Sequence, residues 1–156
     1  MNFQVVALPD TEFQPLYGMS EAELARRGVL VTTAASSTGY PCRVSLRDAD
    51  AGARMLLLNF EHQPANSPYR STHAIYVQDG ATRADVEVNA VPDVLRTRLL
   101  SVRAFDAEGM IIDADVVDGE GAAEVFRRLL GNDRVAYLHV HNAKRGCYAA
   151  RVNRLP

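Results

Sequence analysis

The feature that most constrains the fold is a pair of alternating apolar and polar runs in the last part of the chain. The runs cover residues 135–141 and 147–153, and the segment between them, 142–146, contains an asparagine and a glycine that favour a turn. Successive side chains of a strand point to opposite faces, so Tyr137, His139 and His141 share one face. The pattern predicts a β-hairpin with both imidazoles on the same side.

The register of this hairpin decides what surrounds the two histidines. A register that pairs His141 with Cys147 also pairs His139 with Ala149, and it places Arg151 further along the same face. Two imidazoles, a thiol and a guanidinium would then lie in one small patch. We therefore expect the reactive chemistry of the chain to concentrate on this hairpin.

The rest of the chain repeats the strand pattern and adds a few helical segments. A capping box, Ser20-Glu-Ala-Glu23, begins a short helix that ends at Gly28. Apolar residues recur at helical spacing over residues 120–130, and Pro92 opens a possible helical turn. Strands are expected over residues 3–8, 29–33, 44–47, 54–60, 73–78, 84–88, 98–105 and 110–117.

Strands outnumber helices, and several neighbouring strands are joined by turn residues. This predicts a single α+β domain over residues 1–156, with a mostly antiparallel sheet and two or three short helices. Residues 61–70 contain two prolines, an asparagine and a serine, so an irregular loop is expected there. A loop of this length in a small domain is commonly functional.

Composition narrows the possible partners. The net charge is −2, which gives no electrostatic reason to expect nucleic acid. No apolar run approaches the roughly 20 residues that span a bilayer, and no secretory signal is visible, so no membrane partner and a cytoplasmic location are expected. Two cysteines are too few for a disulfide framework. A homodimer is left open.

The histidines offer a first kind of site. A His-x-His pair on a strand places two neutral nitrogen ligands on one side, roughly 7 Å apart at the backbone. His139 and His141 could hold two positions around a divalent transition metal such as Zn. The third ligand would come from His62 or Glu61 of the predicted loop, from Cys147 or from Cys42, and His62 is the first candidate. Neither a Cys-x-x-Cys nor a His-Glu-x-x-His motif accompanies them. The alternative is a set of hydrogen-bonded histidines without metal.

A thiol mechanism is the second kind. Cys147 follows Arg145-Gly146, and an adjacent cation and imidazole favour the thiolate. Cys147 as nucleophile, with His141 or His62 as general base, would form a catalytic group. The alternative is that the cysteines are buried apolar residues.

The third kind is an anion site. Arginine binds carboxylates and phosphates through two parallel hydrogen bonds, and several arginines lie on or beside predicted strands. The alternative is that they form ion pairs that support only the fold. The candidate substrate-binding residues are Arg43, Arg70, Arg103, Arg151 and Tyr69.

Several short motifs resemble a known family when they are taken together in order. They resemble a bacterial family, domain of unknown function 1203, over most of the chain. The resemblance implies a small single-domain bacterial protein and assigns no catalytic role to any residue. The motifs are Gly39–Ala49, Leu58–His62, Ser67–Arg70, Arg98–Phe105, His139–Ala143 and Gly146-Cys147.

These observations lead to two hypotheses of function. The first is binding or turnover of a small anionic molecule at a His/Cys/Arg site, with a divalent metal as a possible cofactor. The second is a non-catalytic binding or interaction module, in which the same residues form a structural network of ion pairs and hydrogen bonds. Whether the protein is an enzyme is left open.

Overall fold

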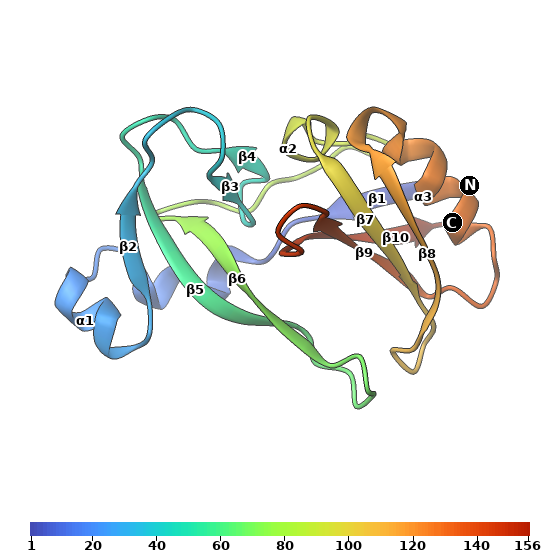
Figure 1. Cartoon of the computed structure of the whole chain (residues 1–156), viewed down its shortest axis with the longest axis horizontal. Helices are drawn as coiled ribbons and strands as arrows, with labels where there is room; N and C mark the ends of the chain where they lie inside the picture. Colours follow the sequence, from blue (N-terminus) through green and yellow to red (C-terminus); the bar gives the residue numbers. More distant parts are fainter.

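The strands form two five-stranded sheets, where the sequence predicted one mostly antiparallel sheet. The computed structural model describes all residues from Met1 to Pro156 (Figure 1). Sheet A contains, in spatial order, β1 (Asn2–Val6), β10 (Tyr148–Leu155), β9 (Tyr137–Asn142), β7 (Leu99–Phe105) and β8 (Ile111–Asp118). Sheet B contains β2 (Leu30–Thr33), β5 (Arg54–Gln63), β6 (Ser71–Gln78), β3 (Pro41–Cys42) and β4 (Arg47–Asp48).

Strand directions largely agree with the expectation from the sequence. All neighbours in sheet A are antiparallel, and in sheet B only β3 and β6 run parallel. The helices are short, so the molecule is mainly β. They are α1 (Glu21–Arg26), α2 (Asp93–Arg96) and α3 (Ala122–Leu130), with single 3-10 turns η1 (Asp10–Glu12), η2 (Gln14–Leu16) and η3 (Gly119–Gly121).

The capping signals found in the sequence place α1 correctly. The Ser20 hydroxyl accepts a hydrogen bond from the Glu23 backbone N–H at 3.2 Å, and Gly28 closes the segment with φ +75°. The helical spacing over residues 120–130 corresponds to α3, which turns Phe126 into the core against Phe3 with ring centroids 5.4 Å apart. Local sequence rules therefore suffice for these two helices.

Helix α3 covers one face of sheet A, and the end of the β5–β6 hairpin of sheet B contacts the other face. The covered face carries Leu100, Val102 and Ala104 of β7 and Leu138 and Val140 of β9, all fully buried in a 20-residue cluster that includes α3. Sheet B has a smaller cluster of its own. Because side chains alternate along a strand, Ser101 and Arg103 of β7 and His139 and His141 of β9 point away from α3.

Three expected segments differ in the structure. The strand expected over residues 44–47 is replaced by a tight turn over residues 43–46, with Leu46 at φ +50°, and Arg47 already belongs to β4. Residues 84–88 form no strand. The loop predicted over residues 61–70 is shorter, because β5 continues to Gln63 and β6 begins at Ser71. Cross-strand pairing extends the ladder until the prolines, which lie near the tip, interrupt it.

The tip of the β5–β6 hairpin rests on the turn between β7 and β8. The Ser67 hydroxyl donates a hydrogen bond to the Gly109 carbonyl at 2.8 Å. A Cβ at Gly109 would lie 2.4 Å from the Ala65 Cβ, and φ at Gly109 is +81°. This contact joins the two sheets at a point where only glycine fits.

We expect Gly109→Ala to weaken this contact. A side chain at positive φ costs about 1 kcal/mol, and the overlap with Ala65 forces the backbones apart at a further cost of at least about 1 kcal/mol. Gly80→Ala is the matched control, because Gly80 has φ +83° and open space around the added Cβ. Urea unfolding should show the larger loss of stability for Gly109→Ala, and equal losses would contradict the contact.

Candidate metal centre

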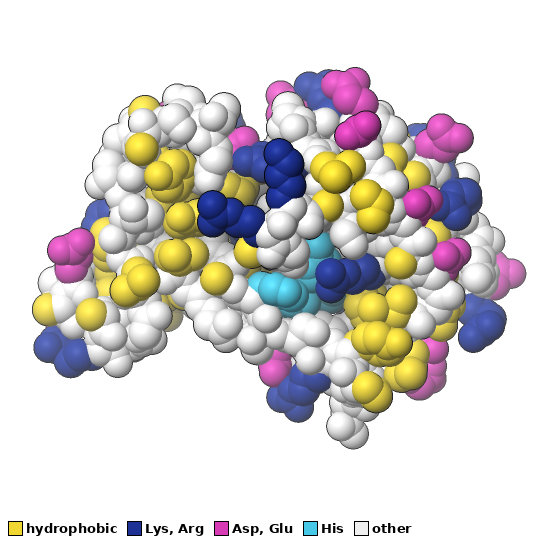
Figure 2. Space-filling model, in the orientation of Figure 1, with side chains coloured by type: hydrophobic (Ala, Val, Ile, Leu, Met, Phe, Trp, Pro, Cys, Tyr) yellow, Lys and Arg dark blue, Asp and Glu magenta, His cyan; other side chains and the backbone are white.

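All four histidines of the chain come together between the two sheets. His62 and His73 belong to sheet B, and His139 and His141 belong to sheet A. Ring centroids are separated by 4.7 Å for His62 and His73, 5.1 Å for His62 and His141, 5.6 Å for His62 and His139, 5.1 Å for His73 and His141, and 6.4 Å for His139 and His141. Figure 2 shows histidine at the surface in the hollow between the sheets, beside a Lys or Arg side chain.

Alternation along β9 places its two histidines on the face opposite α3, as the sequence predicted. Both are almost fully buried, with 2% of His139 and none of His141 exposed. On one side β7 sets Arg103 against His139 and Ser101 against His141. On the other side β10 sets Tyr148 against His141. The pair is thus held in the middle of a continuous ladder.

A β-bulge places His62 against this pair. In the β5–β6 ladder Glu61 pairs with Thr72 and Gln63 pairs with Ser71, so His62 is the extra residue. A bulge re-aims side chains, and here both His62 and Gln63 are buried. The His62 ring stacks on Tyr148 of sheet A at 4.8 Å with an interplanar angle of 12°.

The neighbouring Gln63 also fastens the hairpin to sheet A. Its side-chain amide donates a hydrogen bond to the Tyr137 hydroxyl at 2.9 Å, and that hydroxyl lies 3.2 Å from the Gln63 carbonyl oxygen. Tyr137 in turn stacks on Phe105 of β7 with ring centroids 5.3 Å apart. The bulge is therefore held against sheet A by two neighbouring residues, His62 and Gln63.

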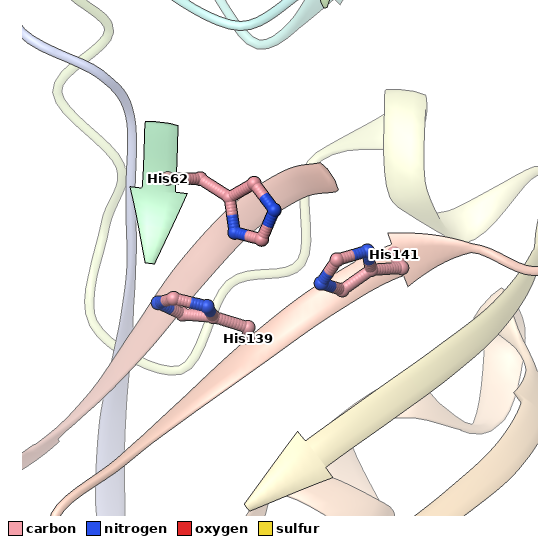
Figure 3. A group of neighbouring side chains, drawn as sticks. All are labelled: His62, His139 and His141. Carbon is pink, nitrogen blue, oxygen red and sulfur yellow. The ribbon is translucent and has the colours of Figure 1, made fainter. Parts of the chain in front are cut away.

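Three of the imidazoles present a set of nitrogens suited to a metal ion. One ring nitrogen from each of His62, His139 and His141 lies within 4.8 Å of the others. Buried nitrogens without a hydrogen-bond partner occur on the same three rings, at His62 Nδ1, His139 Nδ1 and His141 Nε2. Figure 3 shows the three rings turned toward a common centre. Buried polar atoms nearly always have hydrogen-bond partners, so three unpaired ring nitrogens in one place require an explanation.

Hydrogen bonds on the remaining nitrogens fix two of the three rings, those of His141 and His62. His141 Nδ1 lies 2.8 Å from the Gly146 carbonyl. A carbonyl only accepts, so Nδ1 carries the proton and Nε2 keeps its lone pair when the ring is neutral. His62 Nε2 lies 2.6 Å from His73 Nδ1, and one ring donates to the other.

Burial keeps these histidines neutral at pH 7. Desolvation lowers the pKa of His62 to about 4, that of His141 to about 3 and that of His139 to about 2. It also lowers the pKa of the half-buried His73. A metal binds the neutral imidazole, so the cluster is in the ligand form at neutral pH.

Two of the predicted arginines lie at the cluster. Arg103 is half-buried, makes no hydrogen bond or ion pair, and its charge contributes to lowering the pKa of all four histidines. Arg151 pairs with His139 in the ladder, but its guanidinium is occupied: it lies 3.9 Å over the Tyr137 ring and donates to Asn153. Arg103 is therefore the free cation of the site.

The expected pairing of His141 with Cys147 is wrong. His141 pairs with Tyr148, and a bulge at Ala149 then brings Arg151 opposite His139. Cys147 lies before β10, half-buried, and makes no hydrogen bond with a histidine. The turn ends one residue later than the sequence pattern suggested, so the thiol lies outside the ladder.

The other predicted binding residues make no hydrogen bond with a histidine, although the charge of Arg43 contributes to lowering the pKa of His73. Arg70 forms an exposed ion pair with Glu61, at 2.9 Å between Nε and Oε2, as the structural alternative predicted. Tyr69 is exposed near the hairpin tip. Arg43 is buried and donates to the backbone carbonyls of Tyr148 and Pro41.

Sequence reasoning missed His73 and Tyr148 as members of the site. His73 was expected only as the first residue of a strand, and Tyr148 as a residue of the opposite face. Extending the hairpin to pair residues 61–63 with 71–73 would have found His73. The longer turn that brings Tyr148 opposite His141, and the bulge that follows it, have no signal in the sequence.

A family model matches residues 39–154, which include all four histidines and both strands of the terminal hairpin. The chain belongs to the DUF1203 family. The family is described as a protein of unknown function, so membership names no activity for these histidines. Neither a curated protein nor a solved structure matches this DUF1203 chain. None of its helices has the length and apolar character needed to cross a membrane.

We expect the buried histidines to make stability depend on pH. Their pKa values in the folded chain lie below the ordinary value of about 6.5. Between pH 6.5 and about 4, these histidines therefore bind protons in the unfolded chain but not in the folded chain. Stability is then lost as pH falls, by up to about 1.4 kcal/mol per pH unit for each histidine. Urea midpoints measured with a chelator at pH 7 and pH 5 test this.

Carboxylates also titrate in acid, so a variant is needed to assign the effect. His62→Gln removes one of the titrating groups and should show a shallower loss between pH 7 and pH 5. A wild-type midpoint that does not move, or a variant with the same pH dependence as the wild type, would contradict the assignment.

Proposed function

We propose that the protein binds a divalent transition metal, such as Zn²⁺, through His62, His139 and His141, and that this centre binds or turns over a small anionic molecule. The observation that carries the proposal is the set of three orphaned nitrogens on rings that face one another. We propose these nitrogens as the ligand atoms: Nδ1 of His62, Nδ1 of His139 and Nε2 of His141.

The donor set fits zinc. Three neutral imidazoles leave a fourth position for water or an anion, which is the pattern of catalytic rather than structural zinc sites. Structural sites are usually closed by four protein ligands, and the only cysteines, Cys42 and Cys147, are not part of the cluster. Figure 2 shows histidine at the surface in the hollow between the sheets, so solvent reaches the edge of the cluster.

Groups around the ligands orient them as outer-shell partners do in metal sites. The Gly146 carbonyl holds the proton of His141 on Nδ1, away from the proposed ligand atom. His73 Nδ1 accepts the proton of His62 Nε2 in the same scheme and leaves His62 Nδ1 for the metal. We therefore assign His73 as a positioning residue.

Arg103 supplies the anion preference. A guanidinium next to a dication is repelled unless negative charge lies between them. Arg103 has no carboxylate partner in the protein, so an anionic ligand at the fourth position would satisfy both cations. A bound metal would polarise such an anion or activate water beside it, and Arg103 would hold the anion in place.

Two of the predicted substrate-binding residues, Arg70 and Arg151, fit the hypothesis of a structural network better than a binding site. Arg70 forms an ion pair with Glu61, and Arg151 donates a hydrogen bond to Asn153 and lies over the ring of Tyr137. These residues serve the fold and are left out of the proposed centre. The histidines do not fit the same description, since a structural network would leave fewer of their nitrogens without partners.

Metal titration tests the centre directly. Apo-protein prepared without a histidine tag should take up one equivalent of Zn²⁺ or Co²⁺ by calorimetry or absorption spectroscopy. His73→Gln should weaken binding about 10- to 100-fold as an outer-shell change, and substituting His62, His139 or His141 by glutamine should weaken it more.

Cys147→Ser is the matched control for metal binding, because it changes a potential ligand residue outside the cluster. Its affinity should equal that of the wild type. Absence of stoichiometric binding by well-folded wild-type protein would overturn the proposal, and a loss of affinity in Cys147→Ser would place the thiol among the ligands instead.

Because the ligands come from both sheets, the metal should also stabilise the fold. Zinc at 100 times its dissociation constant adds about 2.7 kcal/mol to the free energy of unfolding, or about 5–10 °C in melting temperature for a chain of this size. Thermal unfolding with and without Zn²⁺ measures the shift. His139→Gln and His141→Gln should abolish it, while an equal shift in these variants would indicate metal bound elsewhere.

A further inference from the structure

A cleft of about 610 Å³ lies on the other side of the β9–β10 turn from the histidines. Lys144, Arg145 and Cys147 of this turn line the cleft, while the Gly146 carbonyl of the same turn contacts His141. The volume falls within the range of small-molecule sites. No histidine lines the cleft, so it is distinct from the proposed metal centre.

The cleft contains positive charge without matching negative charge. Four of its lining residues are cationic and none is acidic. Arg98 is neutralised by Asp48, with nitrogen–oxygen distances of 2.7 and 2.9 Å. Lys144 and Arg145 are exposed and form no ion pair.

Arg43 is the strongest sign of a missing ligand. Only 4% of it is exposed, and no carboxylate pairs with it. Nε donates to the Tyr148 carbonyl at 2.8 Å and Nη1 to the Pro41 carbonyl, while Nη2 makes no hydrogen bond. Burial lowers its pKa only to about 10, so it stays charged at pH 7. Buried charges are normally paired, and this one borders an open cleft.

The remaining wall is apolar and aromatic. Tyr40 and Tyr76 lie against each other with ring centroids 5.3 Å apart, and Leu57 lies beside them in the lining. All three are half-buried. A fully hydrated inorganic ion would leave this wall without a partner, whereas a molecule with a flat apolar body would cover it.

We propose that this cleft binds a small organic anion, with its carboxylate or phosphate group at Arg43, Lys144 and Arg145 and its apolar body against Tyr40, Tyr76 and Leu57. The group supplies the negative charge that Arg43 lacks and can accept a hydrogen bond from Nη2, the one guanidinium nitrogen without an acceptor in the protein. The inference goes beyond the metal centre and does not depend on it.

Binding to chelator-treated protein tests the cleft without involving the metal. The probes are 1-naphthoate, 1-naphthyl phosphate, neutral 1-naphthalenemethanol and inorganic phosphate, each titrated by calorimetry. At least one naphthyl anion should bind about tenfold or more tightly than both the neutral alcohol and inorganic phosphate. The order of the two naphthyl anions identifies the preferred head group. Equal affinities for the anions and the alcohol would overturn the proposal.

Two variants locate the binding. Lys144→Ala/Arg145→Ala changes only exposed turn residues and should weaken the preferred anion about tenfold or more. Arg26→Ala/Arg27→Ala removes two adjacent exposed cations outside the cleft and should leave the affinity unchanged. Equal effects of the two double variants would show non-specific attraction and contradict the proposal.

Arg43→Met tests the buried cation, with circular dichroism to establish that it folds. A folded variant should lose the preference for the anion over the alcohol, and one that retains this preference would refute the role of Arg43. If it does not fold, the turn variants still decide the proposal. Zinc binding is measured separately on the same samples, so that a loss of anion binding in the cleft can be distinguished from a loss of zinc binding at the metal centre.

Discussion

The site depends on the contact between the end of the β5–β6 hairpin and the polar face of sheet A. His62 stacks on Tyr148, and Gln63 exchanges hydrogen bonds with Tyr137. Each sheet has its own apolar cluster, so neither core by itself brings His62 to the histidines of β9. Three contacts set the distance between sheet A and sheet B. They are the stacking of His62, the hydrogen bonds of the Gln63 amide, and the packing of the hairpin tip against Gly109.

The same alternation that gives sheet A its core also concentrates the histidines. Apolar side chains of β7 and β9 face α3, and this leaves Arg103, His139 and His141 on the opposite side. Polar and aromatic residues close that side, and they bury the imidazoles without giving three of the ring nitrogens a hydrogen-bond partner. Burial depresses their pKa values, and the neutral rings retain lone pairs that the protein does not use.

Local patterns in the sequence predicted the local structure well. The capping box of α1, the helical spacing of α3 and the alternation around His139 and His141 correspond to the observed elements. The third member, His62, was also expected to join that pair. What the sequence did not reveal depends on single inserted residues: the bulge at His62, the bulge at Ala149 and the resulting partners His73 and Tyr148. A bulge shifts a register without changing the apolar pattern, and the division into two sheets depends on long-range packing that no short window records.

Strand order in sheet A has a consequence for biosynthesis. β9 lies between β7 and β10, and β1 completes its ladder only against β10. The ribosome releases β10 after every other strand, so His139 and His141 have no finished sheet to support them while the nascent chain is still emerging. Any metal would then bind to a supported centre only after β10 has paired with β9, and chains that stall before β10 would carry all four histidines without the ladder that holds them.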